Sequence, residues 1–225
     1  VAFGSSVMRR GGIYFSPVYS GSVEPVVLND EYGAIYIYLL PFLKPANVRR
    51  FFPDAEIETH NDALAAAIGA IETDSAERNV IVSHQFVTGA VTSESEELSV
   101  GGLENVDAAL YDKFDYSALG HIHRPQSMEG GRIRYCGTPL KYSFSEANDE
   151  KSVTIVDIKR KGDIEITKCP LKPLHDLREI RGTYDELADR KSYTKENRHD
   201  YIRAVLTDET EIPRAMDRLR AIYPN

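Results

Sequence analysis

The sequence predicts an α/β protein that ends in a second, smaller α+β unit, and three observations support this. Short apolar strands alternate with amphipathic helices over the first part of the chain. Two segments, 80–82 and 115–120, have the composition of strands buried on both faces of a parallel sheet. From about Pro173 the pattern changes to β-α-β-α. We therefore expect a boundary between residues 1–172 and residues 173–225.

The elements of the first unit follow from turn residues, caps and β-branched runs. A helix is expected to end at Gly11-Gly12, because glycine favours the conformation that terminates helices. A second, Ala-rich helix has Thr59 or Asn61 as its cap. The polar loop 88–102 has a length that is usually functional or mobile. Helices are predicted at 2–10, 59–72 and 107–114, and strands at 13–19, 25–29, 33–42, 78–86, 115–120, 132–138, 152–158 and 163–169.

The second unit has clear start signals. Thr183 and Glu186 form a capping box that should open a short helix. Strands are expected on either side of it, at 175–182 and 200–208, and a last helix at 210–223 tolerates Pro213 in its first turn.

Composition limits the classes of function. The chain has 225 residues, 42% of them hydrophobic and 28% charged, with a net charge of −8. No apolar run approaches the roughly 20 residues of a membrane helix. The acidic balance lacks the basic footprint of a simple nucleic-acid-binding module, although bound cations would still allow an enzyme to handle phosphates. Cys136 and Cys169 are expected to be reduced thiols, so we predict a cytoplasmic protein without membrane partners.

Three histidines are the candidate metal ligands. His121 and His123 are one residue apart at the end of an apolar strand, and in extended backbone such residues point the same way. His84 ends the other buried strand, and ligands in open α/β sheets bind at that end of the strands. Neutral imidazole suits Mn, Fe, Zn, Ni or Cu. Each histidine taken alone also fits a simple hydrogen-bonded ring, so the prediction depends on all three together.

The residues predict only part of a two-metal site. Two-metal phosphoester chemistry uses carboxylates around ions about 3.5–4 Å apart. No Asp-x-His or Gly-Asn-His-Asp stretch occurs in the chain. The acidic run Glu94–Glu97 is interpreted as a solvated loop, and no role is assigned to His60, His175 or His199, which have polar surroundings.

Four segments in a fixed order resemble the SbcD family of nuclease subunits, within the calcineurin-like metallophosphoesterase superfamily. They are VSHQFVTG at 82–89, LSVGG at 98–102, FDYSALGHIHRPQ at 114–126 and RYCGTPLKYSFSEA at 134–147. The Gly-His-x-His motif alone is shared across the superfamily, whereas the order of segments and the last stretch are more specific. The resemblance covers roughly the whole chain and is densest from 80 to 160.

The resemblance implies a fold and a set of ligands. Residues 1–172 would be the C-terminal part of a metallophosphoesterase β-sandwich flanked by helices, and 173–225 part of a capping domain. His84 and His121 would bind one of two divalent metal ions, Mn in this family, and His123 the other. The other ligands and the catalytic residues are expected upstream of Val1. The neighbouring Arg124 would approach a phosphate or pair with a surface carboxylate.

The implied function is hydrolysis of DNA phosphodiesters in repair and recombination, together with an SbcC-like ATPase subunit. The chain alone is expected to have little activity, because one ion would have two protein ligands and the other only one. An uncovered sheet edge predicts self-association. Another metallophosphoesterase, acting on nucleotides or phosphoproteins, and a non-catalytic scaffold remain as alternatives. Tyr142 and Phe144 are expected to pack in the core rather than to stack on bases.

Overall fold

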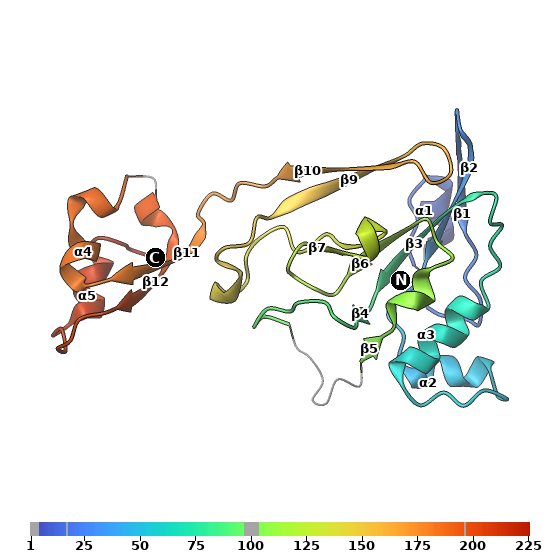
Figure 1. The fold of residues 1–225 in the computed structure, drawn as a ribbon, viewed down its shortest axis with the longest axis horizontal. Helices are drawn as coiled ribbons and strands as arrows, with labels where there is room; N and C mark the ends of the chain where they lie inside the picture. The colour runs from blue at the N-terminus through green and yellow to red at the C-terminus, as the bar shows by residue number, and fades with distance from the viewer. Residues whose placement is uncertain (1–4, 17, 97–103, 196) are drawn as a thin grey trace.

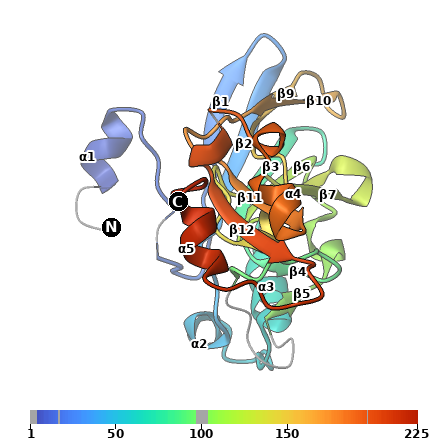
Figure 2. The same ribbon diagram turned by 90° about the vertical axis from the view of Figure 1, so that its left-hand side faces the viewer.

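The fold is mixed α/β and has two parts (Figure 1). The computed structural model describes residues 5–16, 18–96, 104–195 and 197–225. The larger part contains α1 to α3 and β1 to β10, and the smaller part contains α4, α5, β11 and β12. Figure 2 shows the smaller part from its outer side.

The larger part is built on one six-stranded sheet in the order β1-β2-β3-β6-β8-β7. Its four central strands are parallel, and the edge strands β1 and β7 are antiparallel to their neighbours. The strands of this sheet are β1 (Val26–Asp30), β2 (Gly33–Leu39), β3 (Arg78–His84), β6 (Tyr116–Gly120), β7 (Gln126–Met128) and β8 (Ile133–Tyr135). A short parallel pair is formed by β4 (Phe86–Val87) and β5 (Asn105–Val106), and a hairpin by β9 (Ser152–Ile158) and β10 (Ile164–Pro170).

Helix α3 and a hairpin lie against this sheet, whereas α1 stands away from it (Figure 2). The helices are α1 (Ser5–Arg10), α2 (Pro45–Val48) and α3 (His60–Gly69), with 3-10 turns at Arg49–Phe51, Ala108–Tyr111, Glu129–Gly131 and Phe144–Glu146. On one face α3 buries Leu64 and Ile68 in the same cluster as Ile81 of β3 and Leu119 of β6. The hairpin β9–β10 is tied to the sheet by the buried Arg78, which donates to the carbonyls of residues 158 and 159.

Helix α3 begins where its capping residues predict. The Thr59 hydroxyl accepts from the Asp62 amide at 3.1 Å, and the Asp62 carboxylate accepts from the Thr59 amide at 2.9 Å. These hydrogen bonds lower the pKa of Asp62 and satisfy amides that the first helical turn leaves without partners. Thr59, one of the two residues predicted as the cap, is therefore the N-cap of α3.

The smaller part has its own apolar cluster, formed by Leu187, Leu219 and Tyr223. Its elements are β11 (Leu177–Gly182), α4 (Tyr184–Ala188), β12 (Tyr201–Leu206) and α5 (Ala215–Arg220), with 3-10 turns at Arg190–Ser192 and Asn197–His199. The strands β11 and β12 are parallel, and the predicted capping box between Thr183 and Glu186 opens α4. The boundary expected at residue 173 stays a prediction.

One lysine ties the two parts together. The Nζ of Lys141 donates to the Ala147 carbonyl at 2.7 Å and forms an ion pair with Asp176 at 3.0 Å, just before β11. Its side chain is mostly buried. The loop that carries Lys141 thus holds the start of the smaller part.

Several predicted elements differ from the structure. Residues 13–16 and 18–19 form no strand, which corrects the strand predicted at 13–19, and residue 17 lies outside the described residues. The predicted helix at 107–114 is a 3-10 turn of four residues, Ala108–Tyr111. The last helix begins at Ala215, beyond Pro213, and β7 was not predicted. For the first helix only 5–10 can be compared, and this part is helical up to the turn at Gly11-Gly12.

Two further findings concern membrane helices and cysteines, which were considered from composition. In the part of the chain that is described, no helix is both long and apolar enough to cross a membrane. Cys136 and Cys169 are both free and exposed.

Candidate functional site

The ends of two neighbouring strands bring His84 and His121 together. In the parallel register of β3 and β6, His84 lies opposite Gly120, so His121 follows at the same edge of the sheet. The centroids of the two imidazole rings are 5.2 Å apart, and the rings are nearly perpendicular. The two parallel strands predicted from sequence therefore place these two ligand candidates side by side. The expectation that 80–82 is buried on both faces was wrong, because Val82 of β3 is 40% exposed.

Gly120 makes this arrangement possible. A Cβ atom at position 120 would lie 2.7 Å from Nδ1 of His84, closer than real Cβ contacts allow. Only glycine leaves room for the His84 ring across the strand end. The next residue, His121, has a φ of 97°, which is uncommon for a residue with a side chain. Such strained positions cost about 1–3 kcal/mol and cluster at functional sites.

Aromatic rings surround this histidine pair. The Phe42 ring stacks on His121 at 6.2 Å and meets His84 edge-on at the same centroid distance. The Phe86 ring also lies 6.2 Å from that of His121, and the His60 ring packs on Phe42. His60, assigned no role from sequence, is thus a neighbour of this cluster rather than an isolated surface residue.

The surroundings of the pair favour the neutral rings. Partial desolvation lowers the pKa of His84, although this residue is exposed overall, and the adjacent His121 lowers it further; burial likewise lowers the pKa of His121. A lowered pKa favours the neutral imidazole, which is the form that coordinates a metal. The Nε2 atom of His121 is buried and has no hydrogen-bond partner within the described residues. A buried polar atom without a partner calls for an explanation such as a bound ion.

His123 lies in a different environment. Its Nδ1 is 2.6 Å from the Ser95 hydroxyl and 3.6 Å from the Glu146 carboxylate, and its ring is 5.7 Å from that of Tyr142. Its backbone amide donates to Glu96 at 2.5 Å, and its carbonyl accepts from Lys151 at 2.8 Å. Both sides of the His123 backbone are therefore fixed.

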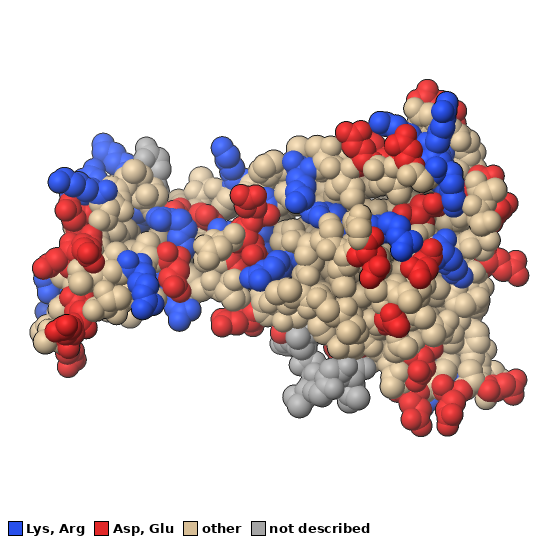
Figure 3. All heavy atoms as spheres, viewed as in Figure 1, with Lys and Arg blue, Asp and Glu red and all other residues tan. Residues whose placement is uncertain are grey.

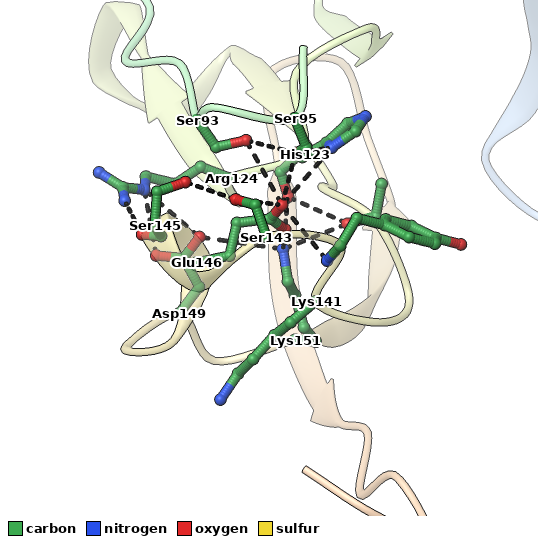
Figure 4. A network of polar contacts seen from close by, with 12 residues as sticks. Ser93, Ser95, His123, Arg124, Lys141, Ser143, Ser145, Glu146, Asp149 and Lys151 are labelled. Atoms are coloured by element: carbon green, nitrogen blue, oxygen red, sulfur yellow. Dashed lines mark hydrogen bonds and ion pairs between the residues drawn. The ribbon is translucent and has the colours of Figure 1, made fainter. Parts of the chain in front are cut away.

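Glu146 is the centre of the network around His123 (Figure 4). Its side chain is fully buried, and its carboxylate accepts from Lys151 and from Ser95, each at 2.6 Å. Burial alone would raise the pKa of Glu146, but the hydrogen bonds from Lys151 and Ser95 outweigh it and lower the pKa to about 2. Glu146 is therefore a buried, ionised carboxylate compensated by one buried cation.

The residues fit a metal in part. Within the described residues, no group of three or more His, Cys, Asp and Glu side chains is arranged to hold a metal ion. His84 and His121 supply two neutral nitrogens, a donor set that suits Mn to Zn but leaves most coordination positions unfilled. His123 turns Nδ1 toward Ser95 and is not grouped with the other two.

Arg124 forms an ion pair. Its Nε is 3.0 Å from Asp149, and its guanidinium donates to the Ser145 carbonyl at 3.1 Å. Of the two roles considered for this residue, the ion pair is present, and contact with a phosphate stays a prediction.

Two expectations near the site were wrong. The acidic run is more than a solvated loop, because Glu96 holds the His123 amide and Ser95 holds its ring; Glu97 lies outside the described residues. Tyr142 is 59% exposed beside His123, so it is not a core residue. The contacts that overturn the interpretation of this loop as solvated join residues 27 to 51 positions apart in the sequence, and no local pattern reveals such contacts.

Comparison with known proteins agrees with the resemblance to SbcD. The SbcD C-terminal family, described as Type 5 capsule protein repressor C-terminal domain, matches residues 173–225. The SbcD component of the nuclease SbcCD of Staphylococcus epidermidis is 32% identical over 226 residues. The alignment covers 99% of this chain and 59% of the relative, so the chain spans about three fifths of the length of that protein. This chain is therefore similar to an SbcD nuclease subunit along nearly its whole length, and its residues 173–225 match the SbcD C-terminal family.

Proposed function

We propose that this chain is part of an SbcD-like nuclease subunit that hydrolyses DNA phosphodiesters with two divalent metal ions, of which Mn is the first candidate. In this proposal His84 and His121 bind one ion and His123 the other. The observation that carries it is the pair of adjacent histidines at the strand ends, with the buried Nε2 of His121 left without a hydrogen-bond partner among the described residues. The remaining ligands and the catalytic residues are proposed to come from sequence upstream of Val1.

The surface charge supports a role for cations in DNA contact. Figure 3 shows Lys and Arg interspersed with Asp and Glu over the face that it draws, and the net charge is −8. Direct attraction of a polyanion by such a surface is weak, so metal ions would supply the positive charge that a phosphate needs.

The similarity to an SbcD component is also the basis for proposing a partner protein. The relative is named as a component of SbcCD, and we propose that the full protein acts in the cytoplasm with an SbcC-like ATPase in DNA repair and recombination. Arg124 would reach a phosphate only after leaving Asp149, so it is the weakest part of this proposal.

Metal binding by the purified 225-residue chain tests the proposal. Titration calorimetry with Mn²⁺ and Zn²⁺ should detect a weak site that His121→Ala abolishes. His199→Ala, a change in the smaller part, is the matched control and should leave binding intact. Equal binding by both variants would contradict the assignment of His121.

Activity provides a second test. The chain alone should show little or no cleavage of linear duplex DNA with Mn²⁺, because each ion would lack ligands. The complete gene should encode Asp-x-His and Gly-Asn-His-Asp motifs before Val1. Strong Mn-dependent cleavage by the chain alone would show that the site is complete within it.

A non-catalytic scaffold is the second candidate. The observation that favours it is that the described residues contain no group of three or more metal ligands. Absence of the upstream motifs from the complete gene would select this alternative over the nuclease.

Self-association of the chain is also proposed, on the basis of exposed apolar residues. The edge strand β1 exposes Val27 and Leu28, and β9 exposes Val153 and Ile155. An unpaired strand edge beside apolar side chains favours pairing between chains. Light scattering should give a mass above 25.2 kDa that rises with concentration; a constant monomer mass would contradict this.

A further inference from the structure

We propose that Glu146 and Ser95 are positioning residues for His123. The Glu146 carboxylate orients the Ser95 hydroxyl, and this hydroxyl holds the His123 imidazole with its proton on Nδ1, so that Nε2 is the nitrogen that binds. What Nε2 binds rests on the proposed function; the choice of tautomer does not.

The hydrogen atom of Ser95 decides the tautomer. The Ser95 oxygen lies 2.6 Å from Glu146 Oε1, 2.6 Å from His123 Nδ1 and 2.8 Å from the Ser93 hydroxyl. A serine hydroxyl has one hydrogen to donate. The Glu146 carboxylate is paired with Lys151 at 2.6 Å, so it can only accept. The Ser95 hydrogen therefore goes to Glu146.

The opposite assignment is excluded by repulsion. If Ser95 donated to His123, its oxygen and the carboxylate oxygen would face each other at 2.6 Å with no hydrogen between them, against a fully buried side chain. Unmatched polar contacts of this kind are costly where water is excluded. With its hydrogen on Glu146, the Ser95 oxygen accepts from Nδ1–H of His123.

Ser93 does not change this result. Its hydroxyl is 2.8 Å from the Glu96 carboxylate and 2.8 Å from the Ser95 oxygen. Whether Ser93 donates to Glu96 or to Ser95, it has no need of the Ser95 hydrogen. The assignment for Ser95 is the same in both cases.

The same network fixes the position of the ring. Lys151 bonds both the Glu146 carboxylate and the His123 carbonyl, and Glu96 accepts from the His123 amide. The carboxylate that sets the tautomer is thus linked to the backbone that carries the ring (Figure 4). Partners that fix the second ring nitrogen in this way set the tautomer and orientation of metal-binding histidines.

Nitrogen NMR of the histidine side chains tests the proposal without metal or substrate. At a pH of about 8.5, where ordinary histidines are neutral, long-range ¹H–¹⁵N spectra of the chain distinguish the two tautomers. We expect His123 to be protonated on Nδ1. In Ser95→Ala it should shift toward the tautomer mixture of the exposed His199, and Ser95→Thr should restore the Nδ1–H form.

The matched control is Ser143→Ala. Ser143 lies 3.5 Å from Glu146 and pairs with Ser145, but has no bond to His123, so this change should leave the tautomer unaltered. Glu146→Gln should shift the tautomer as Ser95→Ala does; if this variant fails to fold, Ser95→Ala still decides. A wild-type His123 protonated on Nε2, or an unchanged tautomer in Ser95→Ala, would overturn the proposal.

Metal titration separates this inference from the proposed function. In the full-length protein, which in this proposal supplies the remaining ligands, Ser95→Ala should lower the affinity for the ion at His123 roughly 10-fold or more. If no metal binds but the Nδ1–H tautomer is found, the proposed function fails and the positioning role stands. If metal binds to His123 with Nε2–H in the free state, the positioning role fails alone.

Discussion

The two halves of the candidate site are held in different ways. The pair of His84 and His121 is placed by the register of two parallel strands, among aromatic rings, with a ring nitrogen left without a partner among the described residues. His123 is placed by a network of loop side chains around a buried carboxylate. Regular backbone can thus position a ligand through one glycine, whereas a loop needs a connected set of charges and hydroxyls.

The largest effect is expected from Lys151→Met, in the loop half of the site, which is the network of Ser95, Glu146 and Lys151 around His123. This change leaves the Glu146 carboxylate buried without its cation, which costs roughly 3–5 kcal/mol of unfolding free energy. Urea denaturation at pH 7 measures it. The double variant with Glu146→Gln should recover much of the loss; a single variant within about 1 kcal/mol of wild type would contradict the buried pair.

Acid should weaken the same half. The pKa of Glu146 is lowered in the folded protein to about 2 from a usual value of 4.5. A lowered carboxyl pKa contributes stability that is present above about pH 4.5 and is lost as the pH falls toward 2. The difference in unfolding free energy between wild type and Glu146→Gln should therefore shrink across this window. A constant difference from pH 6 to pH 3 would contradict the assignment.

The strand half of the site, the pair of His84 and His121, should be disrupted by a change at Gly120. Gly120→Ala places a Cβ 2.7 Å from His84 Nδ1, so the His84 ring must move, at a cost of about 1–3 kcal/mol and with loss of binding at the histidine pair. Thermal unfolding and metal titration check this. Gly69→Ala, with open space around the new Cβ at the end of α3, is the control and should be neutral or stabilising. Equal behaviour of the two variants would argue against crowding at Gly120.

The smallest effect is expected from Phe42→Ala. This change removes the ring that packs on both His84 and His121. Because His84 is already exposed, water gains access mainly to His121, and the larger rise in pKa toward that of ordinary histidine is expected there. Titration by NMR measures the two rings, with the signals of His199 as an internal reference. No rise at either histidine would show that Phe42 does not shield them.

The strand half could be predicted from the sequence, and the loop half could not. Apolar runs located β3 and β6, and parallel strands necessarily align their ends, so His84 and His121 meet. The network around Glu146 depends on contacts across 51 residues, which leave no local trace. The strand predicted at 13–19 failed for a related reason. Of its β-prone residues only Tyr19 is buried, whereas Ile13, Tyr14, Phe15 and Val18 are exposed, and none of its described residues has a paired strand.

The loop that carries Lys141 and Glu146 contacts both parts of the molecule. Lys141 fastens the start of β11, and Glu146, a few residues later, orients the ring of His123 through Ser95. The Nζ of Lys141 also donates to the Ala147 carbonyl, at the peptide next to Glu146. The attachment of the smaller part and the orientation of the His123 ring therefore depend on the same short loop.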